Sequence, residues 1–255
     1  MEVVKSEQRR YIYISPHLDD AVMSCGGLIW EQVHAGIPVD IWTVCAGYAP
    51  EGELSDLAKR IHISWKVTTA KQVIILRREE DYAAARILNV SVSHLDVPDA
   101  MYRKNRFGRN IYPYNVICAP SPADLDLGVI ENMAESISVN GLRPDDTLIC
   151  QLSIGGHVDH RLVRMATERL SRPVFYYIDI PYYLNFPDTL PEFEKGMTSQ
   201  YFAISDSALH IWQDAIAAYV SQIRMLFGSD AMMRQCIADY RQCFNGQKLL
   251  QTKQV

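Results

Sequence analysis

The chain has 255 residues, of which 48% are hydrophobic and 22% charged, a composition typical of a folded globular protein and not of a disordered one. This length suits one α/β domain or two small ones. The formal net charge is −5, so the chain lacks the basic excess that nucleic-acid and anionic-membrane partners require.

The cysteines and the start of the chain bear on its location. Six cysteines are scattered along the sequence without a CxxC pair. The first ten residues, MEVVKSEQRR, lack the apolar core of a signal peptide, and no apolar run approaches the ~20 residues that span a bilayer. We therefore expect a cytoplasmic protein with reduced thiols and no membrane span.

The first 180 residues alternate between short β-rich runs and amphipathic helical runs. In chain order we expect strand 11–15, helix 21–35, strand 38–46, a looser and partly helical stretch 47–68, helix 69–89, strand 90–96, helix 127–140, strand 147–153, helix 160–170 and strand 174–179. This alternation favours an α/β fold with a Rossmann-like, mostly parallel sheet covered by helices on both faces.

Two stretches depart from the alternation. Residues 100–123 have no clear period and contain three prolines, as a lid or substrate loop does. Within them, 101–110 (MYRKNRFGRN) holds four basic residues, which suits either recognition of an anionic group or a solvated basic loop. After the Pro/Tyr-rich connection 181–196, two helices over 207–227 and 230–244 form a C-terminal helical extension. We expect one domain over 1–255.

Two polar clusters directly follow predicted strands. Strand 11–15 runs into PHLDD (16–20), and strand 147–153 runs into IGGHVDH (154–160). In open α/β sheets, ligands bind beyond the carboxyl ends of the strands, where the order of the strands reverses. We therefore expect the two clusters to meet in one site.

The side chains of these clusters suit metal-dependent hydrolysis. They offer three imidazoles and three carboxylates. A catalytic zinc site uses three such ligands and leaves a position for water, whose pKa the metal lowers. A further carboxylate can take the proton of that water, and a further His can stabilise charge on a carbonyl oxygen. An Asp-Asp pair also suits an N-cap, but the two clusters together favour a metal site.

The two clusters carry a family resemblance. They resemble the (A/P)HPDD and GHPDH signatures of the LmbE/PIG-L-like zinc-dependent deacetylases, a family that includes the deacetylases of mycothiol, bacillithiol and glycosylphosphatidylinositol synthesis. Leu18 and Val158 stand where Pro is commonest, which removes no functional group. Weaker matches extend over nearly the whole chain: RREE at 77–80, PD at 98–99, GLRPD at 141–145 and YVSQ at 219–222.

The resemblance implies a role for each site residue. The zinc ligands would be His17, Asp20 and His160. Asp19 would be the general base, His157 would stabilise the oxyanion or protonate the leaving amine, and Asp159 would orient His157.

Substrate contacts are also implied. Arg77 and Asp99 would contact the sugar hydroxyls, although a solvated helical charge and a turn residue are equally good interpretations. Some relatives have a Tyr two residues before the first His of GHPDH, where this chain has Gly155. The role of that Tyr is left to one of three tyrosines or to none: Tyr102, Tyr112 or Tyr114.

The expected function is that of a zinc-dependent hydrolase, with one zinc per chain, that removes an N-acetyl group from an amino sugar or a related small-molecule conjugate. The ligand types also suit other divalent ions. The family also makes a homo-oligomer an expectation. Three alternatives stay open: a hydrolase of another amide or carbamoyl bond, a 2-His-1-carboxylate Fe(II) enzyme, and a catalytically silent binding module. The natural substrate is not predicted.

Overall fold

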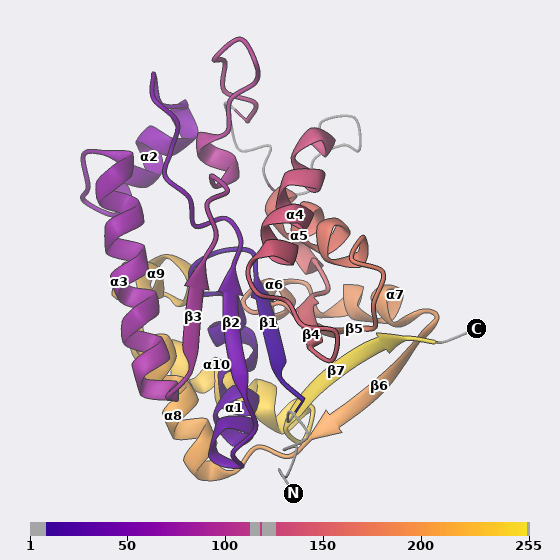
Figure 1. Ribbon diagram of the computed structural model, residues 1–255. Coiled ribbons are helices and arrows are strands. Elements are labelled where there is room, and N and C mark those ends of the chain that lie inside the picture. Colours follow the sequence, from indigo (N-terminus) through magenta and orange to yellow (C-terminus); the bar gives the residue numbers. More distant parts are fainter. Residues whose placement is uncertain (1–8, 113–117, 119–125, 254–255) are drawn as a thin grey trace, which may run out of the picture.

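The computed structural model describes residues 9–112, 118 and 126–253. Its centre is a seven-stranded sheet with the strand order β3-β2-β1-β4-β5-β7-β6 (Figure 1). The strands are β1 (Tyr11–Ser15), β2 (Val39–Thr43), β3 (Ser91–His94), β4 (Thr147–Gln151), β5 (Val174–Tyr177), β6 (Met197–Phe202) and β7 (Gln247–Thr252). The first five strands are parallel, as predicted.

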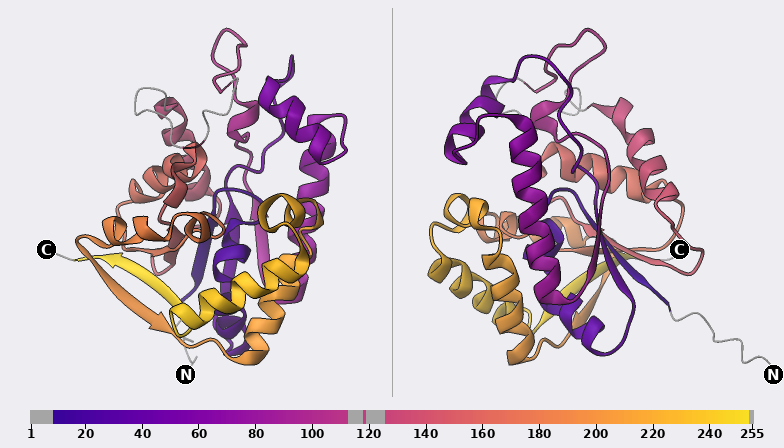
Figure 2. Two further views of the ribbon diagram at one scale, coloured as in Figure 1. Left: turned by 180° about the vertical axis from the view of Figure 1, so that it is seen from behind. Right: turned by 60° about the vertical axis from the view of Figure 1, so that its left-hand side comes forward.

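Helices surround this sheet (Figures 1 and 2). They are α1 (Asp20–His34), α2 (Asp56–Ser64), α3 (Ala70–Leu88), α4 (Ile130–Val139), α5 (Val158–Glu168), α6 (Tyr182–Asn185), α7 (Leu190–Glu194), α8 (Asp206–Ala217), α9 (Val220–Phe227) and α10 (Asp230–Cys243). Helix α8 packs against α1, α3 and α10, while α4 and α5 pack against each other. The predicted α/β class and the C-terminal helical extension are confirmed.

The strands at the centre of the sheet are apolar because both of their faces are covered. Ile12, Tyr13 and Ile14 of β1 are fully buried, as are Leu148 and Ile149 of β4. Continuous apolar runs of this kind are typical of parallel strands with helices on both sides. The two strands that lead into the polar clusters are therefore buried on both faces.

Helix boundaries follow local sequence signals. Helix α3 begins after Thr69, whose side chain accepts a hydrogen bond from the Gln72 N–H while Gln72 caps Thr69 in return. It ends at Asn89, which has the left-handed backbone (φ 54°) that Asn tolerates at a helix end. The predicted helix 69–89 ends at this same residue.

The last quarter of the chain differs from the prediction. A single helix was expected over 207–227, but the chain turns at Tyr219 and forms α8 and α9. The expected Pro/Tyr-rich connection contains the short helices α6 and α7. Strands β6 and β7 were not predicted; β7 is antiparallel to both β5 and β6. Of the predicted loop 100–123, residues 113–117 and 119–125 lie outside the described residues.

Candidate active site

The two polar clusters lie side by side at one end of the sheet. Strands β1 and β4 are neighbours, and each ends where its cluster begins. The chain runs from β1 outward to β2 and β3, and then returns to β4 on the other side of β1 (Figure 1). The clusters therefore occupy the switch point of the sheet, the usual binding position in open α/β folds.

A tight turn after β1 orients the first cluster. The Ser15 hydroxyl donates to the His17 carbonyl (2.6 Å) and accepts a hydrogen bond from the Ala21 N–H (3.0 Å). The Asp20 carboxylate accepts a hydrogen bond from the His17 N–H (2.8 Å). These contacts hold the side chains of His17 and Asp20 on the same side of the turn, at the start of α1.

A second turn, after β4, orients the other cluster. Ser153, Gly155 and Gly156 have left-handed backbones, with φ of 69°, 79° and 67°. This run reverses the chain sharply and lets α5 begin after His157. The turn presents His157 to the site, and His160 follows within the first turn of α5.

The three predicted metal ligands come together. Asp20 Oδ2 lies 3.1 Å from His17 Nδ1 and 3.2 Å from His160 Nε2, and the two imidazole centroids are 5.4 Å apart. His160 Nε2 is buried and is not aligned for a hydrogen bond with any residue that the structure describes. One carboxylate oxygen and two imidazole nitrogens thus converge on a common point, as the ligands of a metal ion do.

The other nitrogen of each imidazole contacts a buried carboxylate. His17 Nε2 lies 3.0 Å from Asp159 Oδ2, and His160 Nδ1 lies 2.8 Å from Asp179 Oδ1. Carboxylate partners of this kind fix the tautomer and orientation of metal-binding histidines. These residues therefore fit a divalent metal ion held by His17, Asp20 and His160.

The charge of the cluster also favours a cation. The cluster contains the guanidinium groups of Arg77 and Arg103, which pair with Asp19 and Asp159. It contains five buried or nearly buried carboxylates: Asp19, Asp20, Asp99, Asp159 and Asp179. Burial alone would lower the pKa of His160, but the carboxylates of Asp20 and Asp179 outweigh it and raise that pKa to about 9. The carboxylates thus attract positive charge to this point.

Two other sets of ligand atoms lie close enough together to hold an ion: His17, His157 and His160, and His17, Asp99 and Asp159. The first set shares His17 and His160 with the predicted ligands, and the second contains two carboxylates. The Asp159 carboxylate, however, already accepts hydrogen bonds from the Arg103 guanidinium and from the Ala100 N–H (2.9 Å). Because this carboxylate is neutralised, it serves better as the partner of His17 than as a ligand.

Asp19 is placed to act as a base. Its carboxylate accepts a hydrogen bond from the Arg77 guanidinium (2.7 Å), which also donates to the Leu18 carbonyl (3.2 Å). Burial raises the pKa of Asp19 to about 6, although Arg77 acts in the opposite direction. A carboxylate with a pKa near neutrality can accept a proton and release it again.

The backbone defines the tautomer of His157. Its Nδ1 accepts a hydrogen bond from the Asp159 N–H (3.2 Å), so a neutral ring carries its proton on Nε2. Burial and the neighbouring His17 hold the pKa of His157 well below its usual range. The Asp159 carboxylate, expected to orient His157, contacts His17 instead. His157 is therefore a neutral N–H donor beside the ligand set.

A cavity of about 230 Å³ opens over this cluster. Its lining includes six of the eight residues predicted for catalysis, metal binding or substrate contact. One of the six is Arg77, whose guanidinium is paired with Asp19. Asp99, also predicted as a substrate contact, lies on the wall, where its carboxylate accepts a hydrogen bond from the Met101 N–H (2.9 Å). Asp159 and His160 lie behind the wall.

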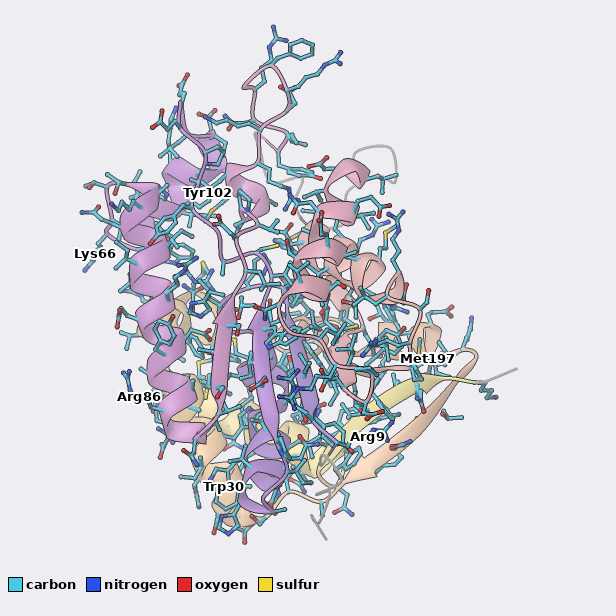
Figure 3. All side chains as sticks on the ribbon, viewed as in Figure 1. Arg9, Trp30, Lys66, Arg86, Tyr102 and Met197 are labelled. Carbon is cyan, nitrogen blue, oxygen red and sulfur yellow. The ribbon has the colours of Figure 1, made fainter. Side chains whose placement is uncertain are left out.

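Tyr182 is the aromatic residue that lies beside Gly155 and the second cluster. Its ring lies 5.1 Å from that of His160 and forms part of the cavity wall. Tyr102, labelled beside α2 in Figure 3, is hydrogen-bonded to His62 (2.7 Å). Tyr112 accepts a hydrogen bond from the Asp126 N–H (2.9 Å), and Tyr114 lies outside the described residues.

Sequence reasoning missed Asp179 and Tyr182. Both follow β5, the neighbour of β4, within the segment YYIDIPYY (176–183). The signal was available for Asp179, because it is a carboxylate at the end of a predicted parallel strand. Nothing comparable marked Tyr182, which depends on how the chain continues after the strand.

Comparison with known proteins decides the family. A model of the PIG-L family, described as GlcNAc-PI de-N-acetylase, matches residues 12–171. The chain belongs to this family. A 2'-N-acetylparomamine deacetylase of Niallia circulans is 28% identical over 253 residues, which cover 89% of this chain and 86% of that protein.

Solved structures agree. The zinc-inhibited form of teicoplanin deacetylase Orf2 is 26% identical with a TM-score of 0.78, and a deacetylase–teicoplanin complex is 26% identical with a TM-score of 0.77. Each comparison covers 95% of this chain and 97% of the other. As a member of the PIG-L family the chain is a metal-dependent enzyme of hydrolytic N-deacetylation, which confirms the predicted enzyme class. None of the helices in the described residues could span a bilayer.

Proposed function

We propose that this PIG-L family enzyme is zinc-dependent and hydrolyses the acetamide of an N-acetylated amino sugar. The observation that carries the proposal is the convergence of His17 Nδ1 and His160 Nε2 on Asp20 Oδ2, with Asp19 and His157 alongside. The relatives support the substrate class, because two are 2'-N-acetylparomamine deacetylases and others act in teicoplanin biosynthesis.

Zinc would be held by His17, Asp20 and His160. When bound, it supplies Lewis-acid chemistry, which polarises a carbonyl and makes water more acidic. Two carboxylates keep the imidazoles facing Asp20. Asp159 pairs with Nε2 of His17 and Asp179 pairs with Nδ1 of His160, in each case the ring nitrogen that points away from Asp20.

Asp19 is the proposed base. Its carboxylate removes a proton from the water that attacks the amide carbon, and Arg77 holds the carboxylate in place through the 2.7 Å contact. A pKa near 6 leaves Asp19 deprotonated at neutral pH and able to pass the proton on to the departing amine.

His157 is the proposed oxyanion donor. Its Nδ1 accepts a backbone N–H, so Nε2–H is free to donate to the carbonyl oxygen as negative charge develops there. Because the pKa of His157 is depressed, this donor stays neutral and Asp19 is left as the group that returns the proton to nitrogen.

The experiment is a measurement of primary-amine release by the zinc-loaded protein from a panel of N-acetylglucosamine derivatives. Asp19→Asn should lower kcat by about 10²–10⁴-fold with zinc content unchanged, the usual range for loss of a general base. Asp188→Asn, an exposed change of the same chemistry, should retain full activity. Absence of amine release by the wild type from every sugar would contradict the amino-sugar assignment and favour another amide or carbamoyl substrate.

We further propose that residues 1–255 form one deacetylase domain of a cytoplasmic protein. One sheet runs through the described residues, and the Niallia circulans relative aligns over 89% of the chain. All six cysteines are free thiols, as reducing compartments favour. Assembly into a homo-oligomer stays a prediction that light scattering would test.

A further inference from the structure

The parts of the cavity wall that come from α2 and α9 consist of neutral side chains. Ile61 and Trp65 come from α2 and its end, and Gln222, Met225 and Leu226 come from α9. Among the lining residues that the structure describes, Arg77 is the sole Lys or Arg. The part of a substrate that extends away from the amide would therefore contact apolar groups and one side-chain amide.

Arg77 is not available to a substrate anion. Its guanidinium lies 2.7 Å from the Asp19 carboxylate and 5.3 Å from the centroid of the Trp65 ring. Its side chain is almost fully buried. An anionic group brought to Arg77 would have to compete with Asp19 for the same positive charge, and would displace the proposed base.

The basic loop over 101–110 does not supply a cation either. Arg103 is buried and pairs with Asp159, while Lys104 donates a hydrogen bond to the Glu51 carbonyl (2.8 Å). None of the four basic residues of this loop lines the cavity. The neighbouring segments 113–117 and 119–125, PYNVI and APSPADL, contain no Lys or Arg in their sequence.

Gln222 is the one neutral hydrogen-bonding side chain of the α9 wall. Its Nε2 donates to the Ser221 hydroxyl (2.7 Å), which donates to Glu80 (2.6 Å), and the Ser221 N–H donates to the same carboxylate (2.7 Å). This chain ties the start of α9 to α3 and leaves the Gln222 amide with its oxygen as an acceptor and one further N–H as a donor. A neutral amide can pair with a hydroxyl or an ammonium group, but it brings no positive charge to a phosphate or carboxylate.

We infer that the site accepts N-acetylated amino sugars whose remaining part is neutral or cationic, and discriminates against anionic conjugates, with Gln222 as a specificity-determining contact. An anionic substituent would lose water without gaining a cationic partner, and unpaired charge is costly to bury. The inference rests on the proposed function and narrows its substrate class by charge.

The test compares three substrates with the zinc-loaded enzyme: methyl N-acetylglucosaminide, N-acetylglucosamine 1-phosphate and 2'-N-acetylparomamine. We expect kcat/KM for the phosphate to be about tenfold or more below that for the neutral methyl glycoside. The cationic substrate should equal or exceed the neutral one. A kcat/KM for the phosphate equal to or above that for the methyl glycoside would overturn this inference and leave the proposed function standing. Turnover of none of the three would overturn the proposed function and the inference with it.

Charge changes at Gln222 test the contact directly. Gln222→Lys should raise kcat/KM for the phosphate relative to the methyl glycoside, and Gln222→Glu should lower this ratio and favour the cationic substrate. The control pair is Gln235→Lys and Gln235→Glu on the exposed surface of α10, which change the net charge equally. Equal shifts at both positions, or no shift at Gln222, would show that Gln222 does not contact the substrate.

Discussion

The ring of Tyr182 occupies the space that a side chain at Gly155 would need. A Cβ atom on Gly155 would lie 2.3 Å from Tyr182 Cδ1, far inside contact distance, and Gly155 also has a left-handed backbone (φ 79°). The same ring lies 5.1 Å from the His160 ring. The absence of a side chain at position 155 and the presence of an aromatic one at 182 are therefore two aspects of one arrangement.

Gly155→Ala should destabilise the fold by about 2–4 kcal/mol, because overpacking adds to the strain of a left-handed alanine. Thermal or urea unfolding would measure the loss. Gly141→Ala is the matched control, since Gly141 is also left-handed (φ 82°) but has no atom within 4 Å of the added Cβ. Gly155→Ala/Tyr182→Ala should recover the steric part of the loss. Equal stability of the two alanine variants would contradict the clash.

Asp179→Asn should weaken zinc binding by about 10–100-fold, because the carboxylate that fixes His160 through Nδ1 is lost. Competition against a chelator would measure the zinc affinity, and circular dichroism would show that the fold persists. Asp145→Asn changes an exposed carboxylate at the opposite ends of the strands and should leave zinc affinity unchanged. An Asp179→Asn protein that binds zinc as tightly as the wild type would remove Asp179 from the site.

Gly26→Ala should destabilise the protein by about 1–3 kcal/mol through overpacking, although alanine is normally the better helix former. The reason is the contact between α1 and α8. A Cβ on Gly26 would lie 2.4 Å from Trp212 Cδ1, and the indole is held by a hydrogen bond to the Val22 carbonyl (2.8 Å). Urea unfolding would measure the change in stability. The control is Gly128→Ala, whose added Cβ meets a single atom at 3.8 Å and which should leave stability nearly unchanged. A Gly26→Ala protein more stable than the wild type would show that α1 and α8 separate easily.

Asp146→Asn should lower the free energy of unfolding at pH 7 by about 1–3 kcal/mol, the range for hydrogen bonds to charged groups. Asp146 accepts two hydrogen bonds from Arg10, at 3.0 and 2.6 Å, and one from the Arg143 N–H (2.6 Å). Burial tends to raise the pKa of Asp146, but Arg10 outweighs it and holds this pKa below its usual value.

The sign of the pH dependence follows. A carboxylate with a depressed folded-state pKa stabilises the fold above its unfolded pKa of about 3.9, and this contribution is lost as the pH falls through the folded value. The gap between wild type and Asp146→Asn should therefore be full at pH 7 and shrink below about pH 4. Unfolding curves at both pH values would measure it. A gap that widens in acid would contradict the ion pair.

The sequence predicts the first 180 residues well because short β-rich runs alternate there with amphipathic helical runs, and β1 and β4 are buried strands that lead into polar turns. The positions of the two motifs beyond β1 and β4 follow from this order alone. Strands β6 and β7 escaped prediction because neither has the apolar run of a central strand: residues 198–201 of β6 are all exposed. The break at Tyr219 was hidden because the residues on both sides of it favour helix.

Within the site, too, some features could be predicted from local sequence and others could not. Residues that are adjacent in sequence, such as Asp19 and Asp20, could be assigned to one cluster from the motif. The partners could not. Arg77, expected to contact the substrate, donates to Asp19, while the Asp159 carboxylate pairs with His17 and the Asp159 N–H contacts His157. Such pairings depend on how α3 and the segment after β3 approach the sheet, which no local pattern specifies.

Strand β7 returns the end of the chain to the sheet beside β5, after α8, α9 and α10 have crossed behind it. The match to the PIG-L family ends at residue 171, before α6 and α9 contribute Tyr182 and Gln222 to the cavity. The proposed metal ligands, Asp19 and Asp179 therefore all precede α6, whereas Gln222, Met225 and Leu226 on one side of the cavity follow it. Recombination between relatives at a point after α6 would exchange that side of the cavity and keep the proposed hydrolytic residues, a route by which one ancestral deacetylase could diversify across many sugars.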